Sequence, residues 1–323
     1  MNRRAAILFV SLGLAWGIPY LLIKVAVEEL SPLTLVLGRT APAALLLLPI
    51  AFAKGAVRPV LARWRPLLAY SVIEIVVPWL LISRAEQHIT SSLAGLLIAA
   101  VPFASVFVAV AFGRREHLGP FGLGGLMVGF AGVAFLVGVD VTGSQWGAVG
   151  EMAVVVVCYA TGAAMLGRWM SDLPGIGVVA VSVAIAALIY TPFAVPGLPS
   201  HFPSGKVVAS VALLAVVCTA AAFLLLFALI NEIGPVRATT ITYLNPVVAV
   251  VAGALVLDER ITVWTVVGFA LVLTGCLGIG RSRRTPAAAG TSSTAEPGQA
   301  TDVPLAADAL RGVPARAAAT MEK

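Results

Sequence analysis

Long runs of apolar residues, separated by short polar segments, dominate the pattern along the chain. The runs are continuous rather than alternating, and each has about the 20 residues that an α-helix needs to cross the hydrocarbon core of a bilayer. They predict spans at residues 5–27, 32–53, 64–83, 90–112, 119–138, 146–168, 175–195, 207–230, 236–256 and 262–280. The pattern therefore predicts an all-α membrane protein with ten transmembrane helices.

The composition agrees with this pattern and excludes two other classes of protein. Of the 323 residues, 60% are hydrophobic and 11% are charged, and the mean hydropathy is +1.01. An ordinary soluble domain has about 25% charged residues. The composition therefore excludes an ordinary globular enzyme and a disordered scaffold. The lipid bilayer is the expected partner, and neither a cofactor nor a metal ion is expected, since no pair of cysteines has metal-ligand spacing.

The positive charges predict the orientation of the chain in the membrane. The net charge is +6. If the N-terminus is cytoplasmic, 13 lysines and arginines lie in or beside inner loops and three on the outer side. This bias is typical of cytoplasmic loops, so both termini are predicted to be cytoplasmic and no nucleic-acid partner is needed to explain the charge. Residues 281–323, rich in Ala, Pro, Thr and Ser, predict a disordered cytoplasmic tail.

A pattern of special residues occurs twice along the chain. The two sets are Pro102, Glu116, Gly125 and Gly132, and Pro246, Glu259, Gly268 and Gly275, at an offset of 144 for the prolines and 143 for the others. Each half has five spans, an odd number, so the halves have opposite orientations in the membrane. We therefore expect two inverted five-helix repeats, at residues 1–143 and 144–280. The glutamates are expected to cap helices, and the glycines to pack closely.

These features resemble the EamA-type, ten-span branch of the drug/metabolite transporter superfamily. The resemblance covers about residues 5–280 and rests on Trp16-Gly17, Lys24, Arg39 and the proline–glutamate–glycine pattern of each half. It implies an inner-membrane transporter, usually an exporter of amino acids or related metabolites. The chain departs from the family pattern at Arg115-Glu116-His117, and Glu74 cannot be carried over from the family.

Two ionisable residues lie within predicted spans. Glu74 is near the centre of the third span, and Arg39 is about seven residues into the second, roughly 10 Å from its outer end at 1.5 Å per residue. Charged groups at this depth usually face a partner or a water-filled cavity. Glu74 is predicted to bind substrate or a proton, or to form a structural interhelical bond. Arg39 is predicted to hold a substrate carboxylate, to pair with Glu74, or to extend towards the membrane surface.

Aromatic and amide side chains complete the predicted substrate site. Trp16, Tyr20 and Lys24 are four residues apart and form one stripe on the first span, although Lys24 can also reach the membrane surface. Tyr243 and Asn245 flank Pro246 and can hydrogen-bond a substrate. The prolines Pro102 and Pro246 are predicted to interrupt equivalent helices beside a central site, or else to be kinks that packing tolerates.

The leading functional hypothesis is a secondary transporter that works by alternating access, with a small-molecule substrate and protons as the candidate coupling ion. The sequence contains no GxxxxGK[ST] loop for ATP. Two alternatives remain. The first is a channel-like facilitator or a receptor that does not transport. The second is an intramembrane enzyme, although all three histidines lie in or beside loops and HExxH is absent.

Overall fold

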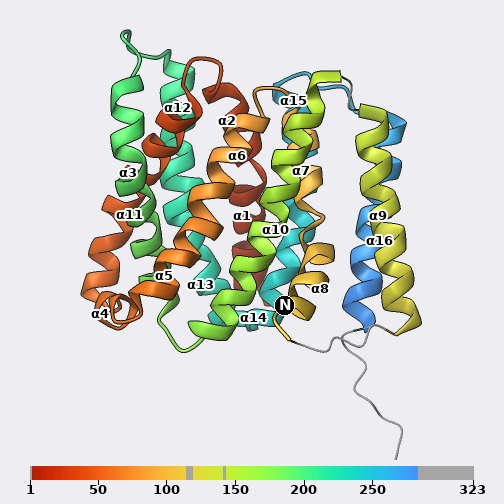
Figure 1. Ribbon diagram of the computed structural model, residues 1–323, viewed down its shortest axis with the longest axis horizontal. Coiled ribbons are helices and arrows are strands. Elements are labelled where there is room, and N and C mark those ends of the chain that lie inside the picture. Colours follow the sequence, from red (N-terminus) through yellow and green to blue (C-terminus); the bar gives the residue numbers. More distant parts are fainter. Residues whose placement is uncertain (1, 114–118, 141–142, 283–323) are drawn as a thin grey trace, which may run out of the picture. The chain divides into compact units, whose positions relative to one another are not determined.

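Helices run back and forth across the described part of the chain, residues 2–113, 119–140 and 143–282 of a computed structural model (Figure 1). Eight of these helices are long and apolar enough to cross a membrane, and two shorter apolar helices, Thr240–Val256 and Val263–Gly278, join them. No β-strand occurs in these residues. The prediction of an all-α membrane protein with ten transmembrane helices is confirmed.

The first repeat contains the first five spans. They are α1 (Arg3–Gly17) with α2 (Pro19–Ala26); α3 (Pro32–Ala53); α5 (Trp64–Ser71) with η1 (Val72–Val76) and α6 (Val77–Ala85); α7 (Ser91–Ile98) with α8 (Val101–Ala111); and α9 (Pro120–Asp140). A short helix, α4 (Val57–Leu61), joins α3 to α5. Several spans are thus built from consecutive helical pieces, and η1 is a π-helical turn within the third span.

The second repeat has the same order of spans. They are α10 (Trp146–Trp169), preceded by η2 (Gly143–Gln145); α11 (Gly175–Ala194) with η3 (Val195–Gly197); α12 (Gly205–Ala215) with η4 (Val216–Ala221) and α13 (Ala222–Ile233); α14 (Pro235–Ala238) with η5 (Thr239–Tyr243) and α15 (Leu244–Val256); and α16 (Val263–Ser282). The segment η4 is also a π-helical turn, so the third span of each repeat is widened at the same place.

Equivalent helices of the two repeats pack against each other. The second spans, α3 and α11, contact along much of their length, where Ala43, Leu47, Ala180 and Val183 are fully buried. The fifth spans, α9 and α16, lie side by side (Figure 1). Lipid tails are as apolar as these side chains, so close van der Waals packing, rather than the hydrophobic effect, holds such helices together.

Glycines allow α9 and α16 to approach closely. A methyl group on Gly275 would lie 2.6 Å from the carbonyl oxygen of Gly125, and one on Gly132 would lie 2.9 Å from that of Gly268. Contacts this short require the backbones to separate. The prediction that these four glycines are close-packing positions is therefore confirmed.

The loops that were predicted to share the inner side contact one another. The side-chain amide of Asn2 donates to Glu232, which joins the start of α1 to the end of α13. The guanidinium of Arg63 donates to both carboxylate oxygens of Asp172, at 2.6 and 2.7 Å. These contacts join the segment before α1 to the end of α13, and the loop before α5 to the loop before α11, and Figure 1 shows α4, α14 and the N-terminus at the same end of the helices.

The loops predicted for the outer side form a second group. Lys206 donates to Glu28 at 2.6 Å, and Gln145 donates to the carbonyl oxygen of His88 at 3.1 Å. The structure thus separates the connections into the two groups that the basic residues predicted. Glu116 and the tail at residues 283–323 lie outside the described residues, as does the remainder of the segment 114–118.

Candidate functional site

Arg39 of α3 is a buried cation in contact with both repeats. Only 8% of its surface is exposed. Its Nε donates to the hydroxyl of Thr219 in η4 at 2.9 Å, and its guanidinium lies 3.7 Å from the centre of the Trp79 ring. Among the described residues, no protein acceptor binds its two terminal amino groups. Arg39 is therefore held firmly in place, with hydrogen-bonding capacity left over for a ligand.

Three aromatic side chains connect Arg39 to neighbouring helices. Trp79 of α6 lies under the Arg39 guanidinium, and α6 packs against α10, which carries Tyr159. Tyr159 also lies within electrostatic range of Tyr20, Arg39 and Glu74. Tyr20 and Trp79 are 9% and 6% exposed. We call Tyr20, Arg39, Glu74, Trp79, Tyr159 and Thr219 the central polar cluster.

Glu74 is the acidic member of the central polar cluster. It lies in η1, and a side chain on Gly162 of α10 would overlap its carboxylate. Its Oε2 is buried and has no hydrogen-bond partner. Burying a carboxylate oxygen without a hydrogen bond costs free energy. A bound proton or a ligand with a donor group would remove this cost, so the position suits either of them.

The π-helical turns position both charged residues. A π-turn shifts the hydrogen-bond ladder of a helix and leaves carbonyl groups for other donors. In the third span, the hydroxyl of Tyr190 on α11 donates to the carbonyl oxygen of Val76 in η1. In the eighth, the hydroxyl of Thr219 donates to the carbonyl oxygen of Leu214 at 2.8 Å and accepts from Arg39. Each turn thus adds polar contacts at the centre of a hydrophobic helix.

The structure does not join Arg39 to Glu74. No ion pair links these two residues, both of which are described, because Arg39 is directed at Trp79 and Thr219 while Glu74 faces Gly162. Of the two partners considered for Arg39 from the sequence, a substrate carboxylate remains open, and pairing with Glu74 is not seen.

The remaining candidate residues lie in different surroundings. Trp16 packs edge-on against Phe223 of α13, with ring centroids 5.8 Å apart. Tyr243 packs with the buried side chains that α7, α8, α9 and α16 contribute. Asn245 is in the first turn of α15, beside Gly17 of α1, and its Oδ1 is buried without a partner. Of the residues predicted from the sequence, the central polar cluster contains Tyr20, Arg39 and Glu74.

Both candidate prolines lie next to changes in helix geometry. The helix α7 ends at Ile98, and Pro102 is in the first turn of α8. Pro246 is the third residue of α15, which follows the 3₁₀ segment η5. Proline is tolerated in a first helical turn because the missing N–H has no partner there.

Replacing both Pro102 and Pro246 by alanine is expected to slow transport several-fold while the protein still inserts. Alanine allows the interrupted helices to become continuous, which opposes the bending that the alternating access expected from the sequence would need. Initial rates in liposomes, compared at equal amounts of folded protein, measure the effect. Unchanged rates in the double variant would reduce the prolines to packing features.

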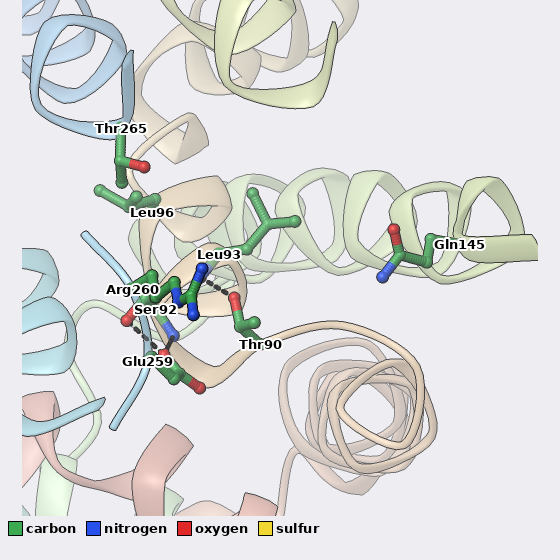
Figure 2. A pocket seen from close by; sticks show the side chains of 8 residues that line it. All are labelled: Thr90, Ser92, Leu93, Leu96, Gln145, Glu259, Arg260 and Thr265. Atoms are coloured by element: carbon green, nitrogen blue, oxygen red, sulfur yellow. Dashed lines mark hydrogen bonds between the residues drawn. The ribbon is translucent and has the colours of Figure 1, made fainter. Parts of the chain in front are cut away.

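A smaller polar group surrounds the turn between α6 and α7, at the end of the helices that the basic residues predict to face outward. Glu259, from the loop between α15 and α16, accepts from the backbone N–H of Ser91 at 2.7 Å and of Ser92 at 3.0 Å. Figure 2 shows Glu259 and Ser92 facing each other beside a pocket of about 130 Å³. The expected capping role of Glu259 is confirmed, and the cap joins the second repeat to the first.

Lys24 and Glu86 lie on the other side of this turn. Lys24 Nζ donates to the carbonyl oxygens of Glu86 and Ile89, at 2.6 and 2.8 Å. Glu86 itself is fully buried, and neither of its carboxylate oxygens has a hydrogen-bond partner. Burial raises the pKa of Glu86 well above its ordinary value, while the positive charge of Lys24 acts in the opposite direction.

Sequence reasoning missed Glu86 and three members of the central polar cluster, Trp79, Tyr159 and Thr219. Glu86 lies three residues beyond the predicted end of its span, where a glutamate is ordinarily solvated. Trp79 lies in a continuous apolar run and has no distinguishing pattern, whereas Thr219 is a polar residue inside such a run and gave a weak signal. Within the described residues, no group of three His, Cys, Asp or Glu side chains is placed to hold a metal ion.

Comparisons with known proteins agree with this architecture. A model of the EamA-like transporter family matches residues 3–138 and again residues 148–281. The uncharacterized inner membrane transporter YedA of Escherichia coli (strain K12) is 28% identical over 277 residues, which cover 81% of this chain and 88% of YedA. The uncharacterized transporter YvbV of Bacillus subtilis (strain 168) is 25% identical over 301 residues, covering 89% of this chain and 95% of YvbV.

A solved structure shares the fold. A chain described as "Crystal structure of protein" superposes with a TM-score of 0.63 at 18% sequence identity, over 88% of this chain and 99% of that chain. Together with the ten apolar helices, the two family matches identify a multi-pass transporter of the cell membrane. The chain belongs to the EamA-like transporter family.

Proposed function

We propose that the protein exports amino acids or related small metabolites by alternating access, with the substrate bound at the central polar cluster between the two repeats. The observation that carries this proposal is a buried cation and a partly buried acid that do not pair with each other. Arg39 has terminal N–H groups without a protein acceptor, and Glu74 has an oxygen without a donor. A substrate with a carboxylate and an ammonium group supplies what each of them lacks.

The surroundings of these two residues support a small zwitterionic substrate. Tyr159 lies within electrostatic range of both Arg39 and Glu74, so the two charges share one region of the protein. Tyr20, Trp79 and Tyr159 provide aromatic surface with a few polar groups, which is the usual composition of a small-molecule site. The helices that contribute these residues, α2, α3, α6 and α10, belong to both repeats.

Binding and flux assays test the proposal. A ligand that binds the folded state raises its stability by mass action, by about 2.7 kcal/mol at 100 times Kd. We therefore expect amino acids, but not their amides or decarboxylated analogues, to raise the melting temperature of the purified protein. Liposomes preloaded with the stabilising amino acids should release them only when they contain the protein. Stabilisation by compounds that lack a carboxylate would contradict the assigned role of Arg39.

We also propose that both termini and the loops near Arg63 and Glu232 are cytoplasmic. The segregation of the loops into two groups and the excess of basic residues in one group support this orientation.

Single cysteines introduced at Gln87 and Pro203 are expected to react with an impermeant thiol reagent added to intact cells, whereas one at Gly55 is not. The natural Cys158, Cys218 and Cys276, which are free thiols, must first be replaced. Lysed cells, in which all three positions should react, provide the control. Labelling of Gly55→Cys from outside intact cells would reverse the proposed orientation.

A further inference from the structure

The turn between α6 and α7 is held from two sides. On one side, the Lys24 ammonium binds the carbonyl oxygens of Glu86 and Ile89 at the end of α6. On the other side, the Glu259 carboxylate binds the N–H groups at the start of α7. Lys24 comes from the first span and Glu259 from the second repeat. This turn therefore closes the outer end of the first repeat against two neighbouring elements, and we call the residues Lys24, Glu86 and Glu259 the outer clamp.

The two carboxylates of the outer clamp have opposite surroundings. Glu259 accepts from two backbone N–H groups and from the hydroxyl of Ser92. Glu86 is 0% exposed and accepts from no donor. Burying an ionised carboxylate without a hydrogen bond is far more costly than burying the neutral acid. The arrangement thus suits a protonated Glu86 beside a Glu259 whose carboxylate is fully hydrogen-bonded.

Lys24 does not remove this asymmetry. Lys24 lies within electrostatic range of Glu86, and so do Arg39 on α3, Tyr20 on α2 and Glu259. The two cations favour the ionised form of Glu86, whereas the Glu259 carboxylate opposes it. The Lys24 ammonium nevertheless donates to backbone carbonyl oxygens and not to the Glu86 carboxylate. The lysine can therefore serve either of two acceptors, the carbonyl groups at the end of α6 or the carboxylate beside them.

We propose that Glu86 is a proton-binding residue of an outer gate, protonated while the outer clamp is closed and deprotonated when the clamp opens to the outside. On opening, the carboxyl O–H bond breaks, the proton passes to external water, and the Lys24 ammonium leaves the carbonyl oxygens to neutralise the carboxylate. Closure reverses each step. This inference rests on the proposed alternating access and on the proposed orientation, which places the clamp on the external side.

The proposal fixes the direction of the pH response. A carboxyl whose proton is held more tightly in the closed state than in the open state favours closure at low pH and opening at high pH. In the range where Glu86 is mostly protonated, its ionised fraction rises by at most about tenfold per pH unit. External alkalinisation should therefore open the gate by up to that factor, and external acidification should close it.

The accessibility of a buried position beside the clamp reports this opening without any substrate. Leu96 is fully buried and lines the pocket next to Glu259. In a protein without natural cysteines, Leu96→Cys is labelled with an impermeant thiol reagent at several external pH values. Each rate is divided by that of Phe202→Cys, a position with 89% exposure on an outer loop, because thiol reactivity itself depends on pH.

We expect the normalised labelling of Leu96→Cys to rise with pH when Glu86 is present and to be slow and independent of pH in Glu86→Gln. Glu86→Asp, which still titrates, should retain a slope. Glu151→Gln, which loses only the partly exposed ion pair with Arg84, is the matched control and should also retain the slope. A pH-dependent Glu86→Gln protein, or a flat response with Glu86 intact, would overturn the proposal.

A change at Lys24 tests the same inference where Glu86 variants fail to fold. Lys24→Met removes the cation that neutralises the open form, so the rise in labelling should move to higher pH. An unmoved profile contradicts the proposed exchange of partners. Because none of these measurements needs a substrate, a failure of amino acid transport would refute the proposed function and leave the labelling result standing.

Discussion

Replacing Arg39 by glutamine is expected to lower transport at limiting substrate by about tenfold to a hundredfold. A hydrogen bond to a charged group contributes about 1.5–3 kcal/mol, and each 1.4 kcal/mol is a factor of ten in affinity. Glutamine can still reach the Thr219 hydroxyl, but it cannot offer a positive charge to a substrate carboxylate. Concentration series of flux in liposomes should show most of the loss as weaker apparent binding.

Two further variants test whether the Arg39 guanidinium recognises the substrate or only supplies a positive charge. Arg39→Lys keeps the charge but loses the planar guanidinium that lies 3.7 Å from the Trp79 ring, so it should restore little of the lost transport. Arg84→Gln removes an arginine that is 57% exposed and paired with Glu151, and it should transport normally. Equal losses in the Arg39 and Arg84 variants would indicate a general effect of positive charge rather than a substrate contact.

Replacing Glu74 by glutamine is expected to reduce transport of amino acids by a similar factor, about tenfold to a hundredfold, with little change in stability. Glutamine has nearly the same shape, and no protein donor is lost at the buried Oε2 because none is present. The loss should therefore be specific to substrates that carry an ammonium group. Flux of an amino acid and thermal unfolding of the same preparation measure the two effects.

The competing explanation for Glu74 is a structural bond between helices. In that case Glu74→Gln should lower the melting temperature clearly, because a buried partner would be left unpaired. Glu151→Gln again provides a control, since Glu151 is a partly exposed acid near the start of α10. A destabilised Glu74→Gln protein with normal affinity for amino acids would remove Glu74 from the proposed site.

The spans were predictable because the thickness of the bilayer sets the length of each apolar segment, and its apolar interior excludes charged residues from most positions. Each apolar run is long enough for a helix to cross the hydrocarbon core, and a helix satisfies the backbone hydrogen bonds within its own segment. The third predicted span, 64–83, corresponds to Trp64–Ala85, and the sixth, 146–168, to Trp146–Trp169. The internal repeat followed from four matched residues, and the pairing of α9 with α16 explains why glycines are among them.

The local geometry within the spans was less predictable. No residue pattern identifies the π-helical turns as such, because Val72–Val76 and Val216–Ala221 are apolar like the helix around them, apart from Glu74 and Thr219. The burial of Glu86 depends on Lys24, Glu259 and other distant parts of the chain that meet only in the folded protein. Arg39 and Glu74 were identified as intramembrane charges, but whether they pair depends on helix rotation, which hydropathy does not specify.

The two π-helical turns also record how the protein arose. Val72 and Val216, the first residues of η1 and η4, are 144 positions apart, and so are Pro102 and Pro246 in the following spans. A residue inserted into only one of these helices would have changed the spacing between the turn and the next proline in that half alone. The spacing is the same, so the simplest history is a single ancestral five-helix unit whose third helix was already widened. Duplication of its gene then gave both halves the same irregularity.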